Sequence, residues 1–179
     1  MAASFQSSVF IYSGSGVPGE QYDDSPSRAL PYTINSVSAA YNIIGSTFCS
    51  IASGAALNNA GVVQAGSGGA LGVAGLLVAP KDYALFGTGG QALNPTLTVS
   101  NQTLIQCATM GRFFVQLPAS ANVGDWVIFD NTTGAISTVT PGTSLPGGKS
   151  WAYGIVSVFS ISAAGLAVID LNPGIGVPT

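Results

Sequence analysis

The second half of the chain alternates apolar and other residues with a period of two, in short runs that turn residues separate. In residues 112–117 (RFFVQL), Phe113, Val115 and Leu117 share one face, and residues 96–100 (TLTVS) alternate in the same way. A period of two is the geometry of a β-strand that buries one face. Several such runs at intervals of about 8 to 12 residues predict an all-β domain.

The C-terminal third predicts two further strand pairs. Residues 126–130 (WVIFD) and 135–140 (AISTVT) flank the loop 131–134, which ends in Gly, as in a hairpin. Residues 151–169 are 19 uncharged residues, near the length of a membrane-spanning helix. Their β-branched, aromatic, Ser and Gly content instead favours two buried strands joined by a turn at 162–165, so no membrane partner is expected.

The first half of the chain has weaker patterns. Residues 1–35 contain many Pro, Gly and Ser residues, which interrupt regular secondary structure. They predict an extended N-terminal arm with one strand at 8–12. The Gly-rich text that follows indicates tight turns and close approach of the backbone, rather than a weak helix. We therefore expect the arm, then an antiparallel β-sandwich or jelly-roll-like barrel over 36–171, then a C-terminal tail over 172–179.

Charged residues are scarce. The chain has 4 basic and 7 acidic residues, 6% of 179, where about 25% is usual. A monomer with so little charge lacks solubilising surface, which predicts coverage by other protein and a homodimer or homotrimer. No basic arm or stripe exists to neutralise phosphates, so we expect no direct contact with nucleic acid.

The sequence lacks the combinations of residues that catalysis or metal binding requires. The chain has no His, and Cys49 and Cys107 are far apart with no CxxC, so we expect no zinc site. The two cysteines could pair, but two small buried thiols are the favoured interpretation. Residues 147–150 (GGKS) resemble the end of a phosphate-binding loop. The Gly expected four residues before the Gly-Lys pair is Thr143, and a β-rich run follows where a helix is needed.

The acidic residues likewise predict turns and no site. Asp23 and Asp24 lie in the arm, and Asp125 follows Gly and is expected to close a turn through its own backbone. Asp130 and Asn131 supply two oxygen ligands where calcium takes six to eight. We therefore assign no catalytic, cofactor-binding or metal residue, and we expect the protein not to be an enzyme.

Three phrases carry a family resemblance: GVAGLLVAPKDYA (72–84), VSNQTLIQCATMGRFFVQLPASANVGDWVIFDNTTGAIST (99–138) and WAYGIVSVFSISAAGLAVIDL (151–171). They resemble the structural cement (head decoration) proteins of tailed bacteriophages, which carry similar CATMG, GD-V-YD-TTGA, AYG-V and AGL-AVI-L phrases. The resemblance implies a β-sandwich or jelly-roll core. It also implies small oligomers that clamp neighbouring capsid subunits from outside.

The expected function follows from this resemblance. The protein binds the outside of an assembled phage capsid and stabilises it by bridging neighbouring major capsid protein subunits. Its place is the outer capsid surface of the virion, and it is made in the host cytoplasm.

Trp126 is expected in the core, whereas Trp151 at the end of a loop is an interface candidate. The candidate interface residues are Tyr22, Asp23, Asp24, Arg28 and Trp151.

Two other binding functions stay open at this stage. One is the carbohydrate-binding head of a viral fibre or a surface lectin, which would use Trp151 and nearby Asn and Thr residues. The other is a jelly-roll coat protein, although a coat around RNA commonly has a basic arm and this N-terminus is acidic. A hydrolase lacks any set of titratable residues that could converge.

Overall fold

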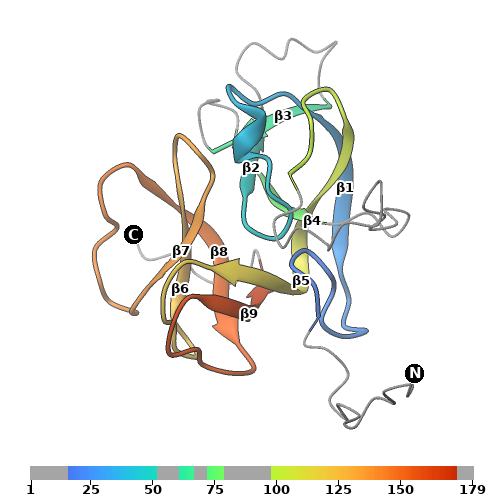
Figure 1. Ribbon diagram of the computed structural model, residues 1–179. Helices are drawn as coiled ribbons and strands as arrows, with labels where there is room; N and C mark the ends of the chain where they lie inside the picture. The colour runs from blue at the N-terminus through green and yellow to red at the C-terminus, as the bar shows by residue number, and fades with distance from the viewer. Residues whose placement is uncertain (1–15, 52–60, 67–71, 79–97, 173–179) are drawn as a thin grey trace, which may run out of the picture.

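A computed structural model describes residues 16–51, 61–66, 72–78 and 98–172 (Figure 1). These ranges confirm an all-β fold. In chain order the elements are β1 (Arg28–Ile34), the short 3-10 helix η1 (Ala39–Tyr41), β2 (Phe48–Ile51), β3 (Val62–Ala65), β4 (Val73–Val78), β5 (Leu104–Leu117), β6 (Trp126–Asp130), β7 (Ile136–Val139), β8 (Lys149–Ser157) and β9 (Gly165–Leu171).

The uncharged stretch 151–169 forms strands, as expected. It contributes most of β8 and the first part of β9, and residues 158–164 connect the two. Within the described ranges, no helix has the length and apolar character needed to cross a membrane. The predicted hairpin is also confirmed, because β6 and β7 pair antiparallel on either side of the loop 131–135.

A first lobe is a closed ring of five strands. Their order is β1-β3-β2-β4-β5, and β1 also pairs with residues 104–110 of β5, which closes the ring. The β1–β3 pairing is parallel, whereas the other pairings of the ring are antiparallel. The ring encloses the first-lobe core: Ile34, Ile44, Cys49, Val63, Ala74, Leu77, Val99, Ile105 and Cys107.

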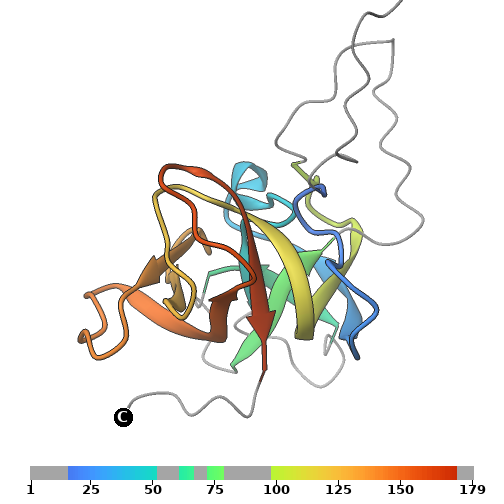
Figure 2. The ribbon, with the colours of Figure 1, turned by 90° about the horizontal axis from the view of Figure 1, so that it is seen from below.

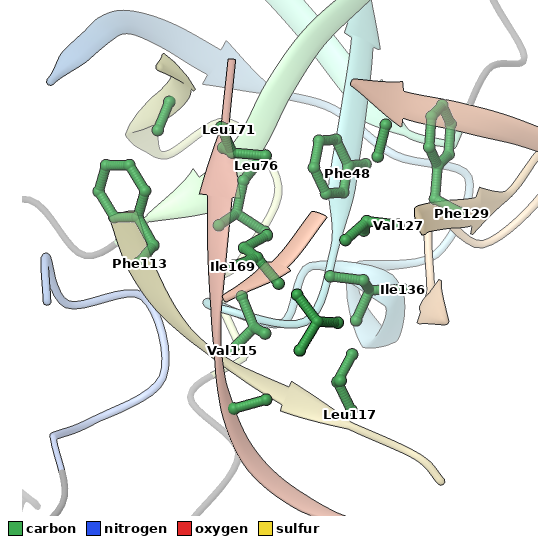
Figure 3. Close-up of a cluster of buried hydrophobic side chains, with 14 of the residues drawn as sticks. Phe48, Leu76, Phe113, Val115, Leu117, Val127, Phe129, Ile136, Ile169 and Leu171 are labelled. Carbon is green, nitrogen blue, oxygen red and sulfur yellow. The ribbon is translucent and has the colours of Figure 1, made fainter. Parts of the chain in front are cut away.

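A second lobe continues from the other half of β5. Residues 111–117 of β5 lead into the order β5-β9-β8-β6-β7. The hairpin then returns to β2, since Phe48 N donates to Gly134 O at 2.9 Å and Ile136 N donates to Ser46 O at 3.1 Å. The two lobes lie side by side in Figures 1 and 2. Figure 3 shows that side chains from β5, β6, β7 and β9 gather around Phe48 and Leu76.

The strands β2, β4 and β5 form a wall between the lobes. Adjacent residues of this wall point into different cores, because side chains alternate across a strand. Both faces are therefore buried, which is why the run VAGLLV of β4 is continuously apolar. The residues facing the second lobe are Phe48, Leu76 and Ala108, and those facing the first lobe are Cys49, Leu77 and Cys107.

Gly75 permits a bulge in this wall. Its φ is +130°, and a Cβ there would lie 2.3 Å from the carbonyl oxygen of Ala108 on the neighbouring strand. The register of β2 against β4 shifts at this point. A residue with a side chain would force β4 and β5 apart, so this glycine confirms the close backbone approach that the Gly-rich text predicted.

One strand lies within residues 1–35, the stretch predicted as an extended arm. Residues 28–34 are β1, which closes the first lobe. Pro31 hid this strand from sequence reasoning, because Pro interrupts the hydrogen bonds of an interior strand. It is tolerated because β3 pairs with Thr33 and Ile34, so that among the described residues Pro31 has a strand partner only in β5. The predicted strand at 8–12 and the tail from 173 onward lie outside the described residues.

Candidate interaction surfaces

The second lobe carries a pair of tryptophans on the side away from its core. Val127 and Phe129 belong to the core, so their neighbour Trp126 points outward. Its ring contacts that of Trp151 edge-on, with centroids 5.3 Å apart and planes at 87°. Trp126, expected in the core, is therefore half-buried on the outward face with Trp151.

The register extends this outward face across the sheet. Phe114 of β5 is opposite Val168 of β9. Trp126 of β6 is opposite Ile155 of β8, and Ile155 is opposite Asp170, which is two residues from Val168 on the same face. Opposed residues of paired strands point to the same side. We name this surface the tryptophan face: Phe114, Trp126, Trp151, Ile155 and Val168.

The first described residues fold against one end of the tryptophan face. Gly19 N donates to Phe114 O at 2.7 Å, and Tyr22 N donates to Arg112 O at 2.8 Å. The ring of Tyr22 contacts the Phe114 ring edge-on at 5.3 Å. Gly16 lies so close to the same ring that a Cβ would come within 2.1 Å of it. We call residues 16–25 the N-terminal clasp.

An arginine bridges the clasp and the sheet. Arg112 Nη1 is 3.1 Å from an Asp23 carboxylate oxygen, and Arg112 Nε is 3.3 Å from Asp170 Oδ2. The Ser25 hydroxyl first, and then the Ser25 backbone amide and Arg112, hold the pKa of Asp23 below its ordinary value. The two carboxylates raise the pKa of Arg112. These groups are well exposed, so the bridge orients the clasp more than it stabilises the fold.

The predicted interface residues fall in different places. Tyr22, Asp23 and Asp24 lie in the clasp, where Asp23 is engaged by Arg112 and Ser25. Arg28 is exposed at the start of β1. Trp151 lies on β8 beside Trp126. The first three are neighbours in the clasp at the Phe114 end of the tryptophan face, and Trp151 lies on the same face beside Trp126.

Sequence reasoning missed an exposed apolar surface between two loops, which we name the apolar tip. Its members are Val123, Val158 and Phe159, exposed by 55%, 47% and 37%. The loops are joined by two hydrogen bonds between Ala121 and Ile161, at 3.0 and 2.9 Å. Neither loop, 118–124 or 158–164, contains a charged residue. The sequence assigned Val158 and Phe159 to a strand, but β8 ends at Ser157.

Val158 has an unfavourable backbone conformation. Its φ is +70°, and Phe159 N donates to Ser157 O at 2.8 Å, which makes a γ-turn centred on Val158. A β-branched residue rarely takes this conformation, and such strain costs about 1 to 3 kcal/mol. The turn directs two large apolar side chains outward. Strain of this kind gathers at functional sites, so the tip is a candidate contact surface.

The loop after β6 is organised by a carboxylate. Asp130 accepts hydrogen bonds from Thr132 N at 2.9 Å and from Thr133 N at 2.8 Å, and it lies 3.4 Å from Lys149 Nζ. The backbone of Thr133 is the largest cause that lowers the pKa of Asp130 to about 2.

Asp125 accepts a hydrogen bond from Asn122 N at 2.8 Å and closes its own turn, as expected. The parts of the chain that the structure describes hold no cluster of three potential metal ligands.

The two cysteines meet inside the first lobe. Both are free and fully buried, in agreement with the expected pair of small buried thiols. A hydrogen bond with Cys49, together with burial, raises the pKa of Cys107 well above its ordinary value. A thiol with a raised pKa is a poor nucleophile, so the pair belongs to the core and not to a reactive site.

The comparison with protein families identifies the family of the chain. A family described as structural cement protein (E217 gp24/Pam3 gp6) matches residues 5–172. The chain belongs to the structural cement protein family. The cement protein is thus a structural component of the phage virion that associates with capsid proteins and stabilises the capsid. No curated protein matches the chain.

The sequence phrases that carried the resemblance lie at turns, at a register shift and where the two lobes meet. CATMG lies in β5, where the strand passes from the first lobe to the second. DNTTGA is the hairpin loop that meets β2. AYG contains Tyr153, whose φ of +52° accompanies a register shift between β6 and β8.

Proposed function

We propose that the cement protein binds the outside of the assembled capsid and bridges neighbouring major capsid protein subunits. The observation that carries the proposal is the apolar tip, an exposed and charge-free surface on a chain that belongs to a capsid-stabilising family. An apolar surface that a strained turn holds in place suits a protein partner better than water. The partner surface is expected to be apolar and uncharged.

The tip is small, so the proposal includes repetition of the contact. An interface of standard size, about 1,600 Å², ranges from micromolar to tighter affinity. A dimer or trimer that contacts several subunits at once gains a factor of about 10² to 10⁴ in avidity. The scarcity of charge favours such an oligomer. Weak individual contacts are therefore sufficient for stable decoration.

The residues predicted from the sequence remain proposed contacts. Tyr22, Asp24 and Arg28 have exposed side chains, whereas Asp23 is held by Arg112. We propose Tyr22, Asp24 and Arg28 as contacts at the rim of the interface and the tip as its apolar centre. Asp23 and Trp151 act through their neighbours, Arg112 and Trp126, in holding the clasp and the tryptophan face.

Decoration of shells that lack the cement protein tests the proposal. The variant Val123→Ser/Phe159→Ser is expected to need at least about tenfold more protein for half-occupancy, because two apolar side chains leave the interface centre. Val37→Ser is the matched control, since Val37 is 94% exposed and lies outside the tip. Thermal unfolding of both variants verifies that each is folded. Equal occupancy for the tip variant and the control would show that the tip is not the contact.

A further inference from the structure

We infer that Ser160 is the positioning residue of the apolar tip: its hydroxyl holds the loop of Val123 in the geometry that contacts the capsid. The inference rests on the proposed function, because it concerns how the same surface binds. It assigns the tip a polar residue beside its three apolar members. Its support comes from the hydrogen bonds that fix Val123, from the link between the two loops, and from the exposure of the side chains held there.

Consecutive backbone amides fix the loop that carries Val123. The amides of the residues on either side of Val123 donate to Asp125 Oδ2 at 2.8 Å and to Val156 O at 2.9 Å. Between them, Val123 N donates to Ser160 Oγ at 3.0 Å. Asp125 and Val156 lie outside the second loop of the tip, residues 158–164. Ser160 is therefore the acceptor that ties Val123 to that loop.

Ser160 supplies the side chain that joins the two loops of the tip. Among the described residues, its hydroxyl makes the one side-chain hydrogen bond between residues 118–124 and 158–164. The other hydrogen bonds between these loops in that part of the chain are the backbone pair of Ala121 and Ile161. Ala121 and Ile161 also pack in the second-lobe core, so this pair is the fixed base of the tip. The Ser160 bond extends the connection from that base toward the exposed end.

The apolar side chains that this bond holds in place are exposed. Val123 is 55% exposed, and Phe159, directly before Ser160, is 37% exposed. Side chains in water gain little from packing, so the position of such a loop depends on its hydrogen bonds. One hydrogen bond between neutral groups changes an equilibrium by a factor of about two to ten. A contact surface that is ordered before binding has a smaller ordering cost, so the Ser160 hydroxyl strengthens binding without adding apolar area.

Amide exchange in the isolated protein tests the bond without a capsid. In Ser160→Ala the Val123 amide should exchange about threefold to tenfold faster, because its acceptor is lost. Ser160→Thr keeps a hydroxyl and should restore slow exchange. Ser162→Ala is the matched control, since Ser162 is exposed on the same loop and its hydroxyl makes no hydrogen bond within the described residues. Unchanged exchange of the Val123 amide in Ser160→Ala overturns the inference.

Decoration of shells that lack the cement protein tests the positioning role. Ser160→Ala should need about threefold more protein for half-occupancy at an unchanged unfolding temperature, and Ser160→Thr should match the wild type. Adding Ser160→Ala to Val123→Ser should change the half-occupancy concentration by less than about 1.5-fold, because Ser160 acts through Val123. The inference is overturned if the two effects multiply, or if Ser160→Ala decorates normally while Val123→Ser is impaired.

Failure of the proposed function gives a different pattern. If the tip is not the contact, Val123→Ser and Val123→Ser/Phe159→Ser decorate shells as well as the wild type does. Ser160 then has no part in binding, even where its loss speeds up exchange of the Val123 amide, and both proposals are overturned together. Impaired decoration by the Val123 variants with normal decoration by Ser160→Ala rejects the positioning role and leaves the tip as the contact.

Discussion

Gly66 lies against the backbone of Asn131, so that a Cβ on Gly66 would be 2.5 Å from the Asn131 carbonyl oxygen. This contact joins the end of β3 in the first lobe to the hairpin loop of the second. Gly66 N also donates to Phe48 O at 2.9 Å, and Phe48 N donates to Gly134 O at 2.9 Å. The two lobes therefore meet through backbone atoms, and side chains would separate them.

Gly66→Ala is expected to destabilise the protein by roughly 2 to 5 kcal/mol, because Gly66 has a φ of +76° and its Cβ has no room. Chemical denaturation measures the change. Gly147→Ala is the matched control, since nothing lies within 4 Å of a Cβ there, and it should change stability by less than about 0.5 kcal/mol. Similar losses for the two variants would contradict the close joint between the lobes.

Asp130→Asn is expected to lower stability by about 1 kcal/mol at neutral pH, since the charged acceptor for the loop amides is lost. Lys149→Met should have a smaller effect, because the backbone of Thr133 is the main cause of the low pKa of Asp130 and Lys149 is a minor one. Equal effects of the two substitutions would assign the loop's stability to the ion pair instead.

The same carboxylate predicts an acid dependence. The pKa of Asp130 is lowered from 3.8 to about 2 in the folded protein, so its contribution is complete above about pH 4 and is lost as the pH falls through about 2. The stability difference between wild type and Asp130→Asn should therefore shrink between about pH 4 and pH 2. A difference that stays constant over this range would contradict the assignment.

Whether the sequence predicted a strand depended on whether one or both faces of that strand are buried. In β5 the residues from Phe113 to Leu117 alternate, because one face meets the second-lobe core and the other faces outward. The pattern therefore predicted the strand and its buried face. In β4 both faces are buried, so Leu76 and Leu77 are both apolar and the period disappears. Only the pairing of distant strands, which local sequence does not contain, identifies β4 as a shared wall.

The surfaces were predictable to a smaller extent. Trp151 was identified as outward by its loop, but the flanking apolar residues of Trp126 indicated burial equally well, and only the register separates the two. Val158 and Phe159 read as a continuation of β8, because nothing in their types marks a left-handed turn. The clasp was missed because part of its contact with β5 is made by backbone atoms of Gly19 and Tyr22, which leave no pattern in the sequence.

Arg112→Met is expected to loosen the N-terminal clasp while the fold persists, because Arg112 is the cation shared by Asp23 and Asp170. Amide exchange of Gly19 and Tyr22, whose N–H groups bond to β5, should speed up by several-fold. High salt should produce part of the same effect in the wild type. Arg28→Met is the control, since Arg28 makes no ion pair within the described residues. Unchanged exchange in Arg112→Met would show that the backbone bonds hold the clasp unaided.

The buried thiol pair predicts a protein whose cysteines react only after unfolding. Cys49 and Cys107 are both fully buried, and the raised pKa of Cys107 leaves almost no thiolate at neutral or mildly alkaline pH. A thiol-specific dye should therefore label neither cysteine in the native protein, and both in guanidinium chloride. Cys107→Ala should cost roughly 1 to 2 kcal/mol through the space it leaves in the first-lobe core. Cys107→Ser should cost more, because its hydroxyl is more expensive to bury than a thiol. If Ser is tolerated as well as Ala, or if the native protein is labelled faster than it unfolds, the thiols are not sealed within the first lobe.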